Sequence, residues 1–249
     1  NGEVIGTVES ERAFTTAHPG AIYMHIGRQY EIEQLDTASR TVVAKPFDGD
    51  WYTQPKYETD TYIERIDESR ELPGGTLHFG HFTVSGQVTG FQTKSISDHQ
   101  TLSLEALELP AQHFTTQALW YTMPDLIPGD ELPLNVLQGS LHAAEHGQIA
   151  VLPLIAMCDR WDIGGLSTAF HPQTGVPTIF IYDGHPGGVG ITRRGYEQFE
   201  RLTADAMRLL EECPCKSGCP SCVQSPKCGN LNEPLHKAGA AKLLRSLTA

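Results

Sequence analysis

Five of the six cysteines of this 249-residue chain lie within sixteen positions, in the segment CPCKSGCPSCVQSPKC at residues 213–228. Thiolates are soft metal ligands, and a Cys-x2-Cys turn presents two of them on one knuckle, as tetrahedral zinc requires. The CPSC turn at 219–222 is such a knuckle, and spacing does not decide whether Cys213 or Cys215 completes the set, although we favour Cys213. The sequence therefore predicts a metal site formed by four of these five residues: Cys213, Cys215, Cys219, Cys222 and Cys228.

Other uses of clustered cysteines fit this segment less well. A disulfide needs Cα atoms about 4.4–6.8 Å apart with converging Cβ vectors, and cysteines two or three positions apart rarely satisfy this. A redox site of the thioredoxin type has a single Cys-x-x-Cys at a helix start. Four thiolates around zinc leave no open coordination position, so we expect a structural Zn²⁺. An iron–sulfur cluster uses the same ligands and stays an open alternative.

A second chemical pattern is HAAEH at residues 142–146, which fits the H-x-x-E-H motif of inverted zinc peptidases. His142 and His146 fall one turn apart on one helix face, and Glu145 would act as a base. The sequence marks no third ligand downstream. We therefore favour a helix with two surface or half-buried histidines over a metallopeptidase.

A glycine-rich turn, YDGHPGGVG at residues 182–190, follows an apolar run and precedes a helical pattern. Backbone N–H groups at such a helix start, together with Arg193 and Arg194, could hold a phosphate of nucleic acid. The chain lacks the GxxxxGK[ST] pattern of a nucleotide-binding loop. The alternative, which we favour, is tight packing between strand and helix with exposed arginines.

Periodicity divides the chain into a β-rich part at residues 1–115 and a mixed α/β part at residues 116–249. Short alternating segments in the first part predict a small antiparallel β-barrel. In the second part we expect a helix from about residue 132, a buried strand at 177–184, a helix over 191–212 and a last helix from Pro234. The expected fold class is α+β, with a helix–zinc loop–helix module at the end.

Charge is distributed unevenly along the chain. The whole sequence carries −12, whereas residues 213–249 contain five basic residues against one acidic residue and carry +4, which leaves −16 for the rest. Phosphate binding needs clustered Lys and Arg, so the basic end, with Lys216 and Lys227, is the expected nucleic-acid surface. No apolar run is long enough for a membrane span. The chain begins at Asn1 without Met, and we expect it to be a piece of a longer protein.

The segment CPCKSGCPSCVQSPKCGNLNEPLHKAGA resembles the C-terminal zinc-binding module of MrfA-type helicases, which are RecQ-like superfamily 2 enzymes of bacteria with fungal relatives. MCDRWDIGGLS and IFIYDGHPGGVGITRRG are similar to the segments upstream of that module. HPGAIYMHIGRQYEIEQLD resembles the β-barrel that follows the helicase core. The resemblance covers nearly the whole chain.

This resemblance implies a function in an ATP-dependent DNA helicase that acts in DNA repair. The ATP site lies in two upstream lobes of such proteins, and this chain has neither a Walker A nor a DEAH-type box, so we expect an accessory region without a catalytic site. Its expected partners are those lobes and single-stranded or forked DNA, in the bacterial cytoplasm at the nucleoid. A protein-interaction scaffold without DNA contact is the remaining alternative.

Overall fold

The computed structural model describes residues 2–129 and 132–248, and the chain folds as two compact units. The first unit contains residues 1–58 and 86–112, and the second contains residues 59–85 and 113–249. This division differs from the expected boundary near residue 115, because the paired strands β4 (Trp51–Leu72) and β5 (Gly75–Ser95) each contribute residues to both units. Long strands that continue from one unit into the other leave no mark in the periodicity of the sequence.

The first unit is built mainly from antiparallel strands. Its three-stranded sheet has the order β1-β2-β3, and β6 pairs with β5. A small core of Ala17, Ala21 and Ile32 lies against this sheet. The elements are η1 (Ser10–Arg12), α1 (Ala13–Thr16), β1 (Ile22–His25), β2 (Arg28–Asp36), β3 (Thr41–Phe47) and β6 (Thr101–Ala106).

The second unit places a layer of helices on a sheet. β9 (Thr178–Asp183) is buried along its whole length and pairs with β7 (Gln112–Thr122) and with β8 (Ile163–Thr168). Successive side chains of a strand point to opposite faces. Ile179 and Ile181 accordingly join the main core, while Phe180 and Tyr182 join a smaller aromatic core. The expected buried strand is confirmed.

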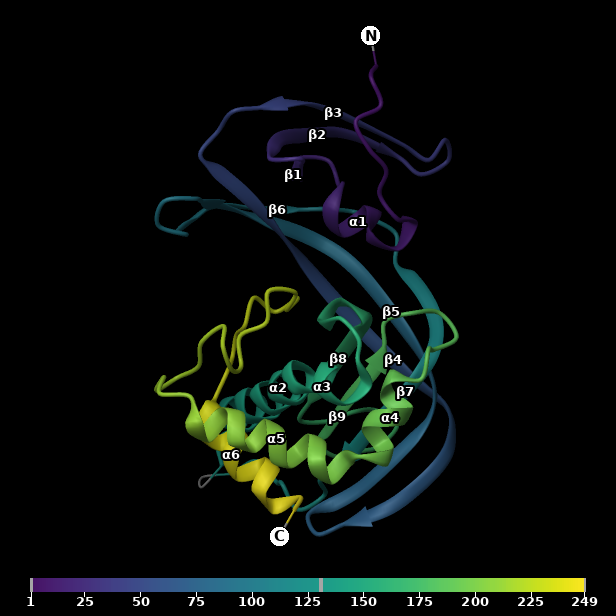
Figure 1. Cartoon of the computed structure of the whole chain (residues 1–249), viewed down its shortest axis with the longest axis vertical. Helices are drawn as coiled ribbons and strands as arrows, with labels where there is room; N and C mark the ends of the chain where they lie inside the picture. Colours follow the sequence, from purple (N-terminus) through teal and green to yellow (C-terminus); the bar gives the residue numbers. More distant parts are fainter. Residues whose placement is uncertain (1, 130–131, 249) are drawn as a thin grey trace. The chain divides into compact units, whose positions relative to one another are not determined.

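Helices α2 (Leu134–Val151), α5 (Phe199–Glu212) and α6 (Lys237–Ser246) pack against one another, and α2 also packs on β8 and β9 (Figure 1). Gly239 explains how α6 approaches α2, because a Cβ atom there would lie 1.9 Å from Oγ of Ser140. The predicted helix over 191–212 is two helices in the structure, since the chain leaves helical geometry at Gln198. The remaining elements are α3 (Pro153–Ala156), η2 (Arg160–Asp162) and α4 (Ile191–Glu197).

These findings confirm the α+β class, with strands in both units, the short helix α1 in the first unit, and α2 to α6 in the second. In the described part of the chain, no helix is both long enough and apolar enough to serve as a membrane span.

Candidate metal centre

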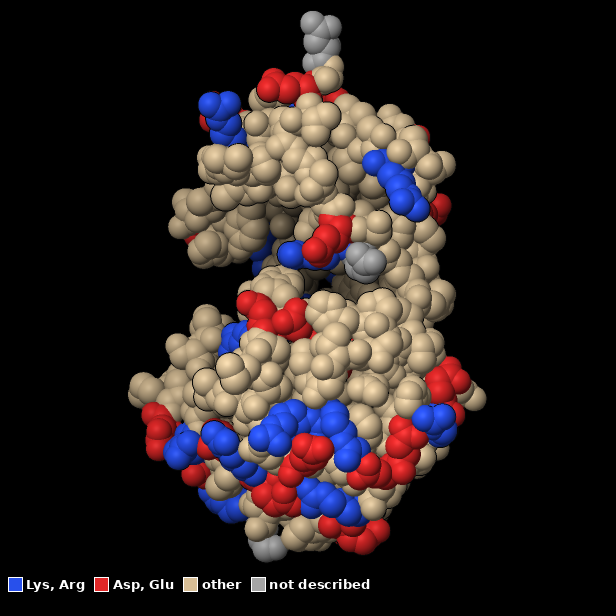
Figure 2. Space-filling view, turned by 45° about the vertical axis from the view of Figure 1, so that its right-hand side comes forward, with Lys and Arg blue, Asp and Glu red and all other residues tan. Residues whose placement is uncertain are grey.

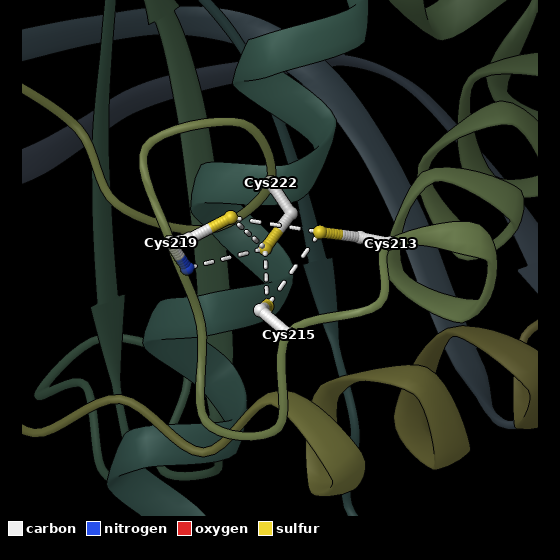
Figure 3. A group of neighbouring side chains, drawn as sticks. All are labelled: Cys213, Cys215, Cys219 and Cys222. Carbon is white, nitrogen blue, oxygen red and sulfur yellow. Dashed lines mark hydrogen bonds between the residues drawn. The ribbon is translucent and has the colours of Figure 1, made fainter.

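Four of the five predicted ligand cysteines converge in the loop between α5 and α6. Their sulfurs point toward one another (Figure 3), and all four sulfurs lie within 4.8 Å of one another. We call Cys213, Cys215, Cys219 and Cys222 the four-cysteine site. Cys213 caps the C-terminus of α5, so this helix fixes one corner of the site. Cys228, the fifth candidate, is placed elsewhere.

The spacing of the sulfurs fits a single tetrahedral ion. Neighbouring sulfurs are 3.5 Å apart for Cys213–Cys219 and Cys215–Cys222, 3.6 Å for Cys213–Cys215 and 3.8 Å for Cys219–Cys222. Zinc–sulfur bonds of about 2.3 Å place the corners of a regular tetrahedron about 3.8 Å apart. The four thiols therefore surround a volume that one zinc ion fills.

The backbone of the loop is shaped for this grouping. The N–H of Cys222 donates to the carbonyl of Cys219 at 3.0 Å, and the N–H of Cys219 lies 3.4 Å from the Cys222 sulfur. Gly218 precedes this turn with φ +123°, which a side chain would strain. A glycine followed by Cys-x2-Cys thus forms the knuckle that the sequence predicts.

Lys237, the first residue of α6, supports the site from outside. Its ammonium group donates to the carbonyls of Cys213 and Cys215, each at 2.7 Å, and lies 3.3 Å from the Cys215 sulfur. A cation at this place offsets part of the negative charge of four thiolates. No pattern in the sequence indicated this role, because one lysine in a helical pattern resembles any surface lysine.

The thiols cannot all ionise without a counter-ion. Although desolvation opposes it, hydrogen bonds from Cys222, Cys213 and Lys237 lower the pKa of Cys215 to about 6. Desolvation, together with the neighbouring thiols, raises the pKa of Cys222 to about 12. Crowded thiolates repel one another, and a divalent ion among them removes this conflict. The donor set therefore fits a metal.

Cys228 lies against helix α2 instead of in the four-cysteine site. Its sulfur is 3.3 Å from Nε2 of His142, and the N–H of Asn232 is 3.3 Å from the same sulfur. The favoured ligand set, which included Cys228 and left Cys215 as a spare thiol, is therefore not the set that the structure assembles. Cys228 comes after a further turn of chain, which carries it past the knuckle to the helix.

The peptidase pattern is buried inside the second unit. His142, Glu145 and His146 are only 7 %, 5 % and 7 % exposed, so a polypeptide substrate has no access to them. Burial raises the pKa of Glu145 to about 7, against the opposing effects of Ser167 and Lys227. The structure thus argues against the metallopeptidase, and the expectation of surface or half-buried histidines is also wrong, because loop residues cover this helix face.

The glycine loop satisfies its own backbone donors. The buried carboxylate of Asp183 accepts hydrogen bonds from N–H groups of Val189 at 2.6 Å, Gly190 at 2.8 Å, Ile191 at 3.2 Å and Thr192 at 2.7 Å. The Thr192 hydroxyl adds a bond of 2.6 Å. Because a side chain of the chain itself holds the start of α4, a phosphate has no free donors there. The favoured packing interpretation agrees with this geometry.

The four candidate DNA-binding residues differ in their surroundings. Arg193 pairs with Glu68 and with Glu197, and Arg194 also pairs with Glu197. In the view of Figure 2, acidic and basic side chains are likewise intermixed over the lower part of the drawn surface. Lys227 points inward, where its ammonium group donates to the carbonyl of Ile163 and burial lowers its pKa to about 8. It is therefore not a surface contact for DNA.

Lys216 and Arg194 are the exposed members of this group, but Arg194 is paired with Glu197. Within residues 2–129 and 132–248, Lys216 has no carboxylate at ion-pair distance. It lies between Cys215 and Cys219, so the four-cysteine site fixes the loop that carries it.

Comparison with known proteins connects this site to a family. The model of the MrfA Zn-binding domain matches residues 144–223, a stretch that contains all four residues of the four-cysteine site and ends before Cys228. The ATP-dependent helicase YprA of Bacillus subtilis (strain 168) is 31% identical over 225 residues, which are 90% of this chain and 30% of YprA. Protein MJ1572.1 of Methanocaldococcus jannaschii is 38% identical over 113 residues, which are 43% of this chain and 98% of that protein.

A solved structure gives the same result. The DUF1998 helicase MrfA bound to DNA matches with a TM-score of 0.62 and 29% identity, over 94% of this chain and 30% of that one. Together these similarities identify a helicase-associated region with a zinc-binding domain. The chain belongs to the MrfA-type helicase family, as the sequence motifs indicated, and it spans 30% of the length of the helicases YprA and MrfA.

Proposed function

We propose that this chain is the zinc-stabilised accessory region of an ATP-dependent DNA helicase that acts in DNA repair. The observation that carries the proposal is the four-cysteine site, with tetrahedral spacing, inside the match to the MrfA Zn-binding domain. YprA is named as an ATP-dependent helicase, and MrfA has been solved with DNA. These names support the same activity for the protein to which the chain belongs.

The metal of this site is a single structural zinc ion. Four sulfurs in mutual contact leave room for one ion, whereas a cluster with its own irons and sulfides would hold them further apart. Zinc supplies a rigid link among four points of the loop. The loop in turn joins the C-terminus of α5 to the first turn of α6, through Cys213 and through Lys237.

This link gives the region its bracing role. A loop of this length cannot bury enough apolar surface to fold alone, and structural zinc supplies about 10–16 kcal/mol of apparent binding energy in small domains. We expect the ordered α5–loop–α6 unit to present a fixed surface to the helicase lobes of the same protein. Loss of the ion would weaken that surface while leaving the ATP site itself intact.

The proposed DNA contact is the tip of the cysteine loop. Lys216 is exposed and unpaired in the described part of the chain, whereas Arg193 and Arg194 would have to leave carboxylate partners to reach a phosphate. Each lysine that meets a phosphate adds to the salt dependence of binding. The contact is therefore local and weak, in keeping with the acidic charge of the remaining chain.

The first experiment measures DNA-stimulated ATP hydrolysis by the full-length protein that contains this chain. Cys219→Ser should lower the stimulated rate several-fold and leave the rate without DNA unchanged. The matched control is Cys158→Ser, which alters a half-buried cysteine outside the site. Equal stimulation of Cys219→Ser and the unmutated protein would contradict the bracing role. A strain carrying Cys219→Ser should also be more sensitive to DNA-crosslinking agents.

The second experiment tests the DNA contact with forked and single-stranded DNA at several salt concentrations. Lys216→Glu in the full-length protein should weaken binding and reduce its salt dependence. Lys242→Glu makes the same charge change at an exposed position of α6 and serves as the control. Identical binding by the two variants would remove Lys216 from the proposal, and no salt-sensitive binding at all would favour a scaffold without DNA contact.

A further inference from the structure

A second group of metal-ligand side chains lies outside the four-cysteine site. Ligand atoms of His142, His146 and Cys228 are within 4.8 Å of one another, and all three residues are buried. The two histidines are one turn apart on α2, with ring centroids 4.3 Å apart, and Cys228 reaches them from the loop that follows the knuckle. The sequence pattern supplied two histidines without a third ligand, and the fold supplies the third.

Hydrogen bonds fix both imidazole rings in the state that binds metal. Nδ1 of His142 donates to the carbonyl of Pro234 at 2.9 Å, and Nδ1 of His146 donates to the carbonyl of Val223 at 2.6 Å. A carbonyl only accepts, so the proton of each neutral ring is on Nδ1 and Nε2 carries a lone pair. Histidines that bind metal almost always have their other ring nitrogen held in this way.

Without an ion, the two Nε2 atoms of His142 and His146 have, within the described residues, only one hydrogen-bond donor between them, the thiol of Cys228. The Cys228 thiol has one hydrogen to give, and its sulfur lies beside Nε2 of His142. Among the residues that the structure describes, no protein group donates a hydrogen bond to Nε2 of His146. A divalent ion would accept both nitrogen lone pairs and a thiolate at once, whereas one thiol serves a single acceptor.

We propose that His142, His146 and Cys228 form a second metal site for Zn²⁺ or a divalent ion of similar softness, with water as the fourth ligand. Two nitrogens and one thiolate suit zinc, and three protein ligands leave one position of a tetrahedron for water. Burial of all three ligands keeps this position closed to polypeptides. The site is thus a second structural metal site and not a peptidase centre.

The second site would hold a different part of the fold from the first. The four-cysteine site joins α5 to the start of α6, whereas the second joins the middle of α2 to Cys228. Carbonyls on both sides of Cys228, at Val223 and Pro234, already bind the same two histidines. The segment from 223 to 234 would therefore be fastened to α2 at three places.

The test counts zinc in the purified 249-residue chain, after dialysis against a small excess of zinc chloride in the presence of a phosphine reductant. We expect two zinc ions per chain by elemental analysis. Cys228→Ser and His142→Gln should each reduce the count to one, and Cys219→Ser should remove the other ion. Cys158→Ser is the control and should keep both. One ion in the unmutated chain, or two in Cys228→Ser, would overturn the proposal.

A measurement on the unmutated chain covers the case in which the variants do not fold. Zinc X-ray absorption reports the average number of sulfur ligands per ion, which should be about 2.5 if one site has four and the other has one. An average of about 4 means that the four-cysteine site alone is filled and overturns the proposal. Far-UV circular dichroism of each variant shows which zinc counts come from folded protein.

Discussion

The cysteine loop at 213–228 and the glycine loop at 184–190 hold similar places along the chain but differ in what satisfies their polar groups. Each follows a regular element and leads toward a helix, and each gathers groups that could bind a ligand. In the glycine loop, Asp183 takes the donors of α4, so the chain fills its own site. In the cysteine loop, four thiols face one another and need an ion.

The difference shows that a motif defines donors but not whether they remain available. Four N–H groups at a helix start would attract an anion if nothing else reached them. Here the carboxylate of Asp183, the last residue of β9, already accepts hydrogen bonds from these N–H groups. The stability of α4 should therefore depend only on contacts within the chain. The stability of the loop before α6 should depend on a bound metal ion as well.

Metal removal should produce the largest effect and test this contrast directly. A strong chelator with reductant should destabilise the 213–236 loop and α6 by several kcal/mol, because zinc binding supplies much of the folding energy of such loops. Hydrogen exchange should rise sharply at residues 237–246 and stay nearly unchanged at residues 191–197. Equal changes in both helices would show that the two loops do not differ in their need for metal.

Asp183→Ala should produce the next largest effect, and this effect should fall on α4 instead of α6. The substitution leaves four N–H groups at the start of α4, two of them buried, without their acceptor. We expect a loss of about 3–5 kcal/mol in unfolding free energy. Exchange should rise at residues 191–197 while the zinc content stays constant. Asp159→Ala, at an exposed turn cap, is the control and should cost much less. Zinc loss in Asp183→Ala would mean that the loops are coupled.

Local patterns predicted much of this molecule. The buried strand at 178–183 and the final amphipathic helix follow from apolar runs and periodicity, which depend on neighbouring residues only. The knuckle at 219–222 likewise depends on residue types a few positions apart. Its partners Cys213 and Cys215 lie in the same loop, so the sequence limited them to a short list.

Contacts between distant segments could not be predicted from spacing. Cys228 is 86 positions from His142, and Lys237 reaches back over 22 positions to Cys215. Lys227 was expected at a DNA surface because its charge counts toward the basic end, yet tertiary packing turns it toward Ile163. Composition gives the charge of a segment, and only the fold decides which side chains face outward.

Lys237→Met examines how far the four-cysteine site depends on support from α6. Removing the ammonium group leaves two carbonyls without their donor and takes a positive charge from beside the thiolates, so we expect a loss of about 1–3 kcal/mol. Zinc should be released at lower chelator concentration than in the unmutated chain. Lys242→Met, on the exposed side of the same helix, should change neither property. Unchanged zinc affinity in Lys237→Met would limit the role of Lys237 to helix packing.

Thr192→Val should have the smallest effect. It separates the contribution of the Thr192 hydroxyl from that of the backbone N–H groups that bind Asp183. The substitution keeps the shape of the side chain and the N–H bond to Asp183 but removes the hydroxyl bond of 2.6 Å. One lost hydrogen bond to a charged group costs about 1.5–3 kcal/mol at most, and the remaining N–H donors keep Asp183 satisfied, so we expect about 1 kcal/mol. Urea unfolding measures this difference. A loss as large as that of Asp183→Ala would mean that the hydroxyl, and not the backbone, holds the carboxylate in place.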